Sequence, residues 1–78
     1  MKQQPAKAAD QLKTLDVLTA IADLAVGHRF QDRTPRLSDV ARAVGLSSRL
    51  LRFGDVDERI STENAAVLAL AKKRSLLS

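Results

Sequence analysis

Arginines are concentrated in the middle of this 78-residue chain. Between positions 29 and 52 there are six arginines and two aspartates, so this segment carries the whole formal net charge of +4. A guanidinium group is planar, permanently charged and able to donate two parallel hydrogen bonds, which suits phosphate oxygens and the O6 and N7 atoms of guanine. The pattern favours binding to nucleic acid, and the alternative is a solvated basic surface without a ligand. The six are Arg29, Arg33, Arg36, Arg42, Arg49 and Arg52.

Residues suited to catalysis or metal binding are scarce. The chain has no cysteine and no tyrosine, and its one histidine, His28, falls in a basic segment. A zinc site needs more thiolate or imidazole ligands than this. Asp55, Asp57 and Glu58 form the one acidic cluster, for which a solvated turn is the simplest role. We therefore expect neither an enzyme nor a metal or cofactor site.

The most basic segment also has the spacing of two short helices joined by a tight turn. Ser38 is a good N-cap for a helix from Asp39 to about Val44, and Gly45 suits a left-handed turn after it. Ser47 would then cap a second helix from Ser48 to about Phe53. The expected structural positions of this helix-turn-helix are Val40, Ala41, Val44, Gly45, Leu46 and Leu51.

The stretch Asp39-Val40-Ala41-Arg42-Ala43-Val44-Gly45-Leu46-Ser47 resembles the opening of the DNA-binding headpiece in the lactose repressor family. A looser likeness extends to residues 60–63 and 67–69. The resemblance implies a helix-turn-helix whose second helix enters the major groove of DNA. The sequence departs from the family pattern in two ways: we expect an additional helix and a basic loop before the motif, and we expect no effector domain after it. No small-molecule effector is therefore inferred.

The resemblance also implies roles for individual side chains. The second helix would expose Ser47, Ser48, Arg49 and Arg52 toward the bases, although both arginines could instead bind phosphate alone. The residues expected to contact phosphates are Arg33, Arg36, Ser38 and Arg42.

The rest of the chain is expected to be helical. Residues 1–8 lack apolar periodicity and are interpreted as a flexible tail, followed by one domain over residues 9–78. A helix is predicted from about Asp10 to Val26 with Gly27 as its stop, then a loop over 27–36 anchored by Phe30. A last helix is predicted from Ser61 or Thr62 to Arg74. The expected fold is a small all-α domain of four helices that leaves space for at most a short wing.

The first predicted helix is apolar over a wider arc than a single core contact requires. This width favours a homodimer with Leu12, Leu15, Leu18 and Ile21 at its interface. In the alternative, the other helices of the same chain wrap around the segment and bury it.

Together these features predict a dimeric transcriptional regulator, a repressor that binds a palindromic operator in double-stranded DNA. The alternative is a small protein-interaction module, such as an adaptor, an antitoxin-like protein or an anti-repressor, on the same scaffold. We expect a cytoplasmic protein that does not contact the membrane, because no apolar run is long enough to span a bilayer and no signal peptide is apparent. The small size would suit a plasmid or phage regulator.

Overall fold

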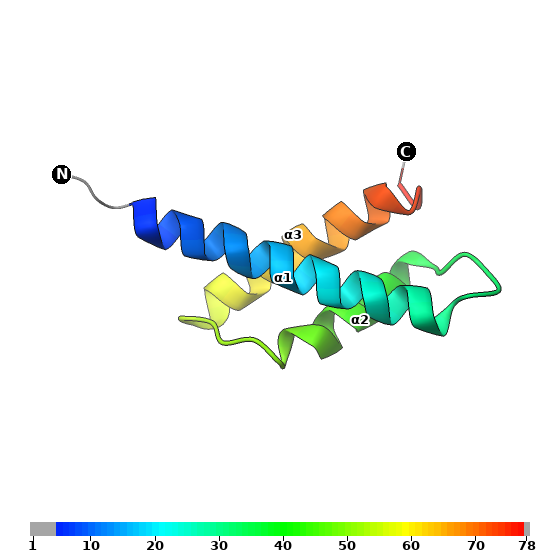
Figure 1. Ribbon diagram of the computed structural model, residues 1–78, viewed down its shortest axis with the longest axis horizontal. Coiled ribbons are helices and arrows are strands. Elements are labelled where there is room, and N and C mark those ends of the chain that lie inside the picture. The colour runs from blue at the N-terminus through cyan, green and yellow to red at the C-terminus, as the bar shows by residue number, and fades with distance from the viewer. Residues whose placement is uncertain (1–4, 78) are drawn as a thin grey trace.

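The protein consists of three helices in the computed structural model, which describes residues 5–77 and the side chains of residues 13–77. Helix α1 spans Pro5–Arg29, α2 spans Leu37–Ser48 and α3 spans Val56–Lys73. Helix α2 runs opposite to α1 and α3, and each helix contacts both others (Figure 1). No strand occurs in residues 5–77, so the prediction of an all-α domain is confirmed, with three helices in place of four.

Helix α1 is longer at both ends than the sequence pattern predicted. It begins at Pro5, a residue that suits the first helical turn because it needs no hydrogen-bond acceptor there. It passes through Gly27, whose φ is not positive, and its end is marked by the bond from Phe30 N to Val26 O at 3.0 Å. The predicted stop at Gly27 is therefore wrong. Residues 5–8 of the predicted tail form the first turn of α1, and residues 1–4 lie outside the described part.

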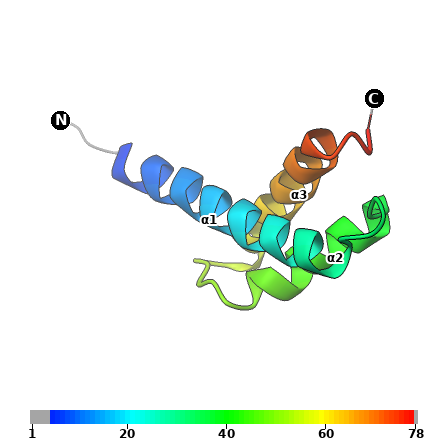
Figure 2. The ribbon, with the colours of Figure 1, turned by 45° about the vertical axis from the view of Figure 1, so that its right-hand side comes forward.

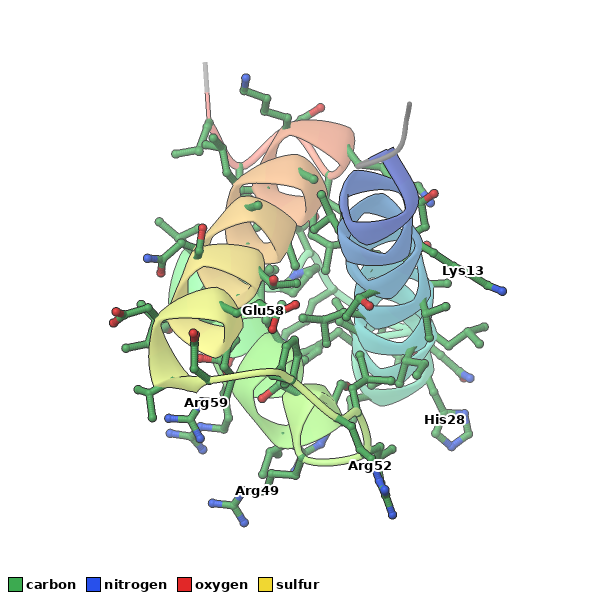
Figure 3. The ribbon with its side chains drawn as sticks, turned by 90° about the vertical axis from the view of Figure 1, so that its left-hand side faces the viewer. Lys13, His28, Arg49, Arg52, Glu58 and Arg59 are labelled. Carbon is green, nitrogen blue, oxygen red and sulfur yellow. The ribbon has the colours of Figure 1, made fainter. Side chains whose placement is uncertain are left out.

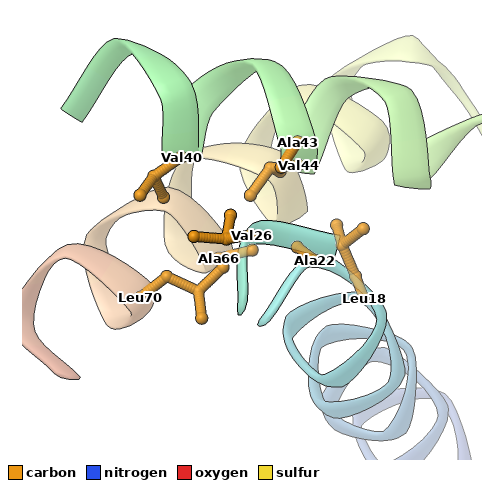
Figure 4. Packing of buried hydrophobic residues seen from close by; sticks show 8 residues of the cluster. All are labelled: Leu18, Ala22, Val26, Val40, Ala43, Val44, Ala66 and Leu70. Atoms are coloured by element: carbon orange, nitrogen blue, oxygen red, sulfur yellow. The ribbon is translucent and has the colours of Figure 1, made fainter. Parts of the chain in front are cut away.

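A small apolar core lies where the three helices meet (Figure 4). Its residues recur at helical spacing, one stripe from each helix, so a single face of each helix is buried. Several are alanines, which let the helix backbones approach closely. Partly buried side chains including Leu15, Phe30 and Leu51 pack around this core. Its central members are Leu18, Ala22, Val26, Val40, Ala43, Val44, Ala66 and Leu70.

The structure does not contain the two short helices expected between residues 39 and 53. Helix α2 continues through Gly45, which has no positive φ, and ends at Ser48. Residues 49–55 form turns and bends, starting with bonds from Leu50 N to Ser47 O and from Leu51 N to Ser48 O at 3.0 and 3.1 Å. Packing explains the difference, because the stripe through Val40, Val44 and Ser47 keeps one helix face on the core beyond the glycine.

The start of α2 is also two residues earlier than expected. The carboxylate of Asp39 accepts a hydrogen bond from Arg36 N at 2.9 Å, and Arg36 is the N-cap residue. Ser38, the predicted cap, lies in the first turn with an exposed side chain. Before it, Pro35 is buried and fixes the end of the 30–36 connection.

Helix α3 begins five residues before the predicted Ser61. Asp55 is its N-cap and accepts a hydrogen bond from Glu58 N at 2.6 Å, while the Glu58 carboxylate accepts one from Gly54 N. Carboxylates at a helix start satisfy free N–H groups and favour the positive end of the helix dipole. Two members of the acidic cluster therefore cap this helix.

Viewed from a second direction, α1 and α3 diverge from their crossing, and α2 packs across them on one side (Figure 2). One side of α2 consequently faces outward. None of the helices in the described part has the length and apolar character needed to cross a membrane.

Candidate nucleic-acid interface

The outward side of α2 carries a line of residues spaced at i, i+4, i+7 and i+11. We call this line, Ser38, Arg42, Gly45 and Arg49, the outer α2 face. Arg49 belongs to it because its backbone, with φ −65° and ψ −20°, continues the helical path one residue beyond α2. Ser38, Arg42 and Arg49 are exposed. Because helix geometry returns to the same side at these intervals, two guanidinium groups flank a glycine on one open surface.

The basic surface continues into the turn after α2. Arg49 and Arg52 both point away from the body of the protein, and Arg59 of α3 lies at the same end of the molecule (Figure 3). Between the first two, Leu51 is partly buried against the core and holds the turn in place. Leu51 thus positions two outward-pointing arginines.

One hollow lies between α1 and the turn after α2, a second lies between α1 and α2, and each is bordered by cations from separate segments. Lys13 and Arg52 border the first, of about 230 Å³. Arg29 and Arg42 border the second, of about 220 Å³, together with the Asp39 carboxylate. Lys13 and Arg29 are sixteen positions apart on α1, a separation of about 24 Å in a helix. Cations of α1 therefore lie beside α2 and beside the turn after it at two well-separated positions.

The other two predicted phosphate contacts lie toward the edge of this surface. Arg36 is exposed at the start of α2. The guanidinium carbon of Arg33 lies 5.0 Å from the centre of the Phe30 ring, a cation–π geometry. Arg33 also borders a polar hollow shared with Lys73 and Arg74. Arg36 therefore lies at the start of α2, whereas Arg33 lies near the C-terminal ends of α1 and α3.

Two of the three cations at the end of α3, Lys73 and Arg74, belong to an ion-pair cluster. Asp23 of α1 accepts hydrogen bonds from Lys73 Nζ at 2.7 Å and from Arg74 Nε and Nη2 at 3.0 and 2.5 Å. The Lys73 hydrogen bond, opposed by burial and reinforced by Arg74, lowers the pKa of Asp23 below its ordinary value. Among the side chains of residues 13–77, the ion pairs are those of Asp23 with Lys73 and Arg74. The arginines of the outer α2 face take no part in them.

The two serines expected to contact bases are inside the protein. Ser47 is 5% exposed and Ser48 is 3% exposed. The Ser48 hydroxyl lies within hydrogen-bonding distance of Gly45 O, at 2.9 Å, and of the Glu63 carboxylate on α3. Ser47 and Ser48 are therefore buried while Arg49 and Arg52 are exposed. We no longer propose either serine as a contact to bases.

The predicted structural positions of the motif divide into two groups. Val40 and Val44 are fully buried and Leu51 is partly buried, whereas Ala41 is exposed and Leu46 is 48% exposed. The small residue that packs in the core is Ala43, which the motif did not single out. The sequence signal that could have identified Ala43 as a core residue is its helical spacing, three residues after Val40.

The residues proposed for a dimer interface are also divided. Leu18 is fully buried in the core of its own chain, and Leu15 and Ile21 are partly buried. The side chain of Leu12 lies outside the described residues. The exposed apolar residues of α1 are instead Val17, at 39%, and Leu24, at 74%, which sequence analysis did not assign to the interface.

Within the described residues, no group of three or more His, Asp or Glu side chains could hold a metal ion. Comparison of the chain with protein-family models, with curated proteins and with solved structures found no match. Its function is therefore inferred from its own residues and their geometry.

Proposed function

We propose that this protein binds double-stranded DNA through the outer α2 face and the turn that follows it. The observation that carries this proposal is the alignment of Arg42 and Arg49 on one exposed side of a helix, with Arg52 next to them and none of the three in an ion pair of residues 13–77. Free guanidinium groups on one exposed surface are suited to neighbouring phosphates.

Affinity in this proposal comes mainly from phosphate contacts. Each phosphate neutralised by an arginine releases condensed counterions, so binding weakens as salt increases. Arg49 and Arg52 project furthest from the body at this end of the molecule and are our candidates for guanine contacts (Figure 3). Arg29, Arg36, Arg42 and Lys13 would position the protein on the DNA backbone.

The biological role we propose is transcriptional regulation, specifically repression, by a homodimer. Val17 and Leu24 form an exposed apolar strip on α1, which is the supporting observation for self-association. Two copies would place two outer α2 faces on half-sites of a palindromic operator about 34 Å apart. A dimer would also bury more surface than one small domain offers to DNA.

The experiment is a titration of fluorescent duplex DNA, of mixed and selected sequences, over several salt concentrations. Arg42→Ala and Arg49→Ala should each weaken binding, and each lost phosphate contact should reduce the slope of log K against log salt by about 0.9. Lys72→Ala is the matched control because it also removes one exposed cation. Lys72 lies nine positions, or half a turn of the helix wheel, from Glu63, whose side chain faces α2. Equal effects of the arginine and lysine changes would contradict the proposal.

A protein-interaction module is the second candidate, favoured by the exposure of Leu24. It predicts a complex with another protein that persists at high salt, since apolar contacts are little screened. Retention on DNA that is lost as salt rises would instead support the first candidate.

A further inference from the structure

Gly45 occupies the middle of the outer α2 face without any requirement of the fold for a glycine. Its φ is not positive, and a Cβ added to it would meet no atom within 4 Å beyond its neighbours and its own helix backbone. A glycine inside a helix is less stable than an alanine there, because its backbone loses more conformational freedom on folding. The free protein would therefore be more stable with alanine.

The other two glycines differ from Gly45 in this respect. A Cβ at Gly54 would lie 2.7 Å from a carboxylate oxygen of Glu58, and one at Gly27 would lie 3.3 Å from Nη2 of Arg74. Each of these contacts is with the end of a side chain that already makes a hydrogen bond, Glu58 with Gly54 N and Arg74 with Asp23. Gly45 is the glycine whose missing side chain leaves open space.

We infer that Gly45 is the point of closest approach between α2 and the sugar-phosphate backbone of the bound DNA. This inference rests on the proposed function. Arg42 and Arg49 flank the glycine three and four positions away, on the same side of the helix. A phosphate held between two guanidinium groups would lie over the residue between them, where only a glycine leaves the main chain uncovered.

Charge supports DNA as the occupant of this surface. From residue 36 to residue 52 the exposed cations are Arg36, Arg42, Arg49 and Arg52, and the one acidic residue is Asp39. The Asp39 carboxylate is engaged by the Arg36 backbone at the start of the helix. A second copy of this surface would place like charges against each other.

The test compares Gly45→Ala and Gly45→Leu with the wild type in two measurements. Thermal unfolding should show a Tm for Gly45→Ala about 4 to 8 °C higher, as expected for a helix-stabilising change in a domain of this size. Affinity for a duplex of roughly 20 base pairs should fall about fivefold to tenfold with alanine and further with leucine, although no charge is lost. Ser61→Ala, at an exposed position of α3, is the control, with a Tm close to that of the wild type and an affinity within about twofold of it.

The outcomes separate this inference from the proposed function. If Gly45→Ala raises Tm and leaves DNA affinity unchanged while the Arg42 and Arg49 variants lose binding, the role of Gly45 is wrong and DNA binding stands. If the wild type binds no duplex even at low salt, both are wrong. A change in sedimentation with Gly45→Ala, with unchanged DNA affinity, would assign the face to a second copy and also overturn the inference.

Discussion

The Ser48 hydroxyl at the end of α2 is hydrogen-bonded to the Glu63 carboxylate of α3. Ser48 is 3% exposed and Glu63 is partly buried, so this bond joins two helices within a partly buried contact. It also holds the last turn of α2 against the protein just before Arg49 projects outward. The bond therefore links the stability of the fold to the position of the basic surface.

Replacing Ser48 by alanine should lower the free energy of unfolding by about 1.5 to 3 kcal/mol, because the carboxylate loses a buried hydrogen-bond donor. Urea denaturation measures this effect. Ser61→Ala, at an exposed position of α3, should change stability by less than about 0.5 kcal/mol. A double-mutant cycle with Glu63→Gln should show coupling, and additive effects of the two changes would contradict a direct contact.

The Asp55 carboxylate starts α3 by accepting the Glu58 N–H. Asp55→Ala should cost about 1 kcal/mol of folding stability, because the first turn loses this acceptor. Asp55→Asn should restore most of the stability, since asparagine is an equally good N-cap. Denaturant titration of the three proteins tests this, with exposed Asp57→Ala as the control on the same turn. Similar losses for Asp55 and Asp57 would indicate a general charge effect on the helix.

The sequence predicted which residues pack inward better than it predicted where the helices begin and end. Val40 and Val44 were correctly expected to pack inward, and Phe30 was correctly expected to anchor a loop. The helix ends were missed because Gly27 and Gly45 are both compatible with ordinary helical backbone. Local glycine and serine signals favoured a turn at Gly45, and packing on the core across the whole helix opposed it. The tertiary contacts of α2 decide between a turn at Gly45 and a continuous helix, and they favour the continuous helix.

The basic surface was predicted in part for a similar reason. The cluster of arginines was visible in the sequence, and all six are exposed. Which of them share a face depends on α2 remaining one helix through Gly45, a property of packing with α1 and α3. The burial of Ser47 and Ser48 depends on the same continuity, since a turn at Gly45 would have rotated both hydroxyls away from the core.

Acid should weaken the protein through Asp23. Its pKa is lowered in the folded state by the Lys73 and Arg74 contacts, so the ionised form stabilises the fold above the ordinary value of 3.8. This contribution is lost as pH falls below 3.8 toward the folded-state pKa. Asp23→Asn should therefore lower stability by about 1 kcal/mol at pH 7 and by progressively less below pH 4. Denaturant titrations from neutral to acid pH, with exposed Asp16→Asn as the control, test this, and a difference independent of pH would contradict it.

Leu24 offers a direct test of the proposed dimer. Its side chain is 74% exposed on α1, so Leu24→Glu should leave the fold intact and change the Tm little. A charge buried at an apolar interface is costly, and the variant should sediment as a monomer at concentrations at which the wild type is dimeric. Leu68→Glu is the matched control, at a 48% exposed leucine of α3. Operator affinity should fall with Leu24→Glu because the two half-sites are no longer bound together. Sedimentation of the wild type as a monomer at every concentration would remove α1 as an interface, whereas loss of the dimer with Leu68→Glu alone would move the interface to α3.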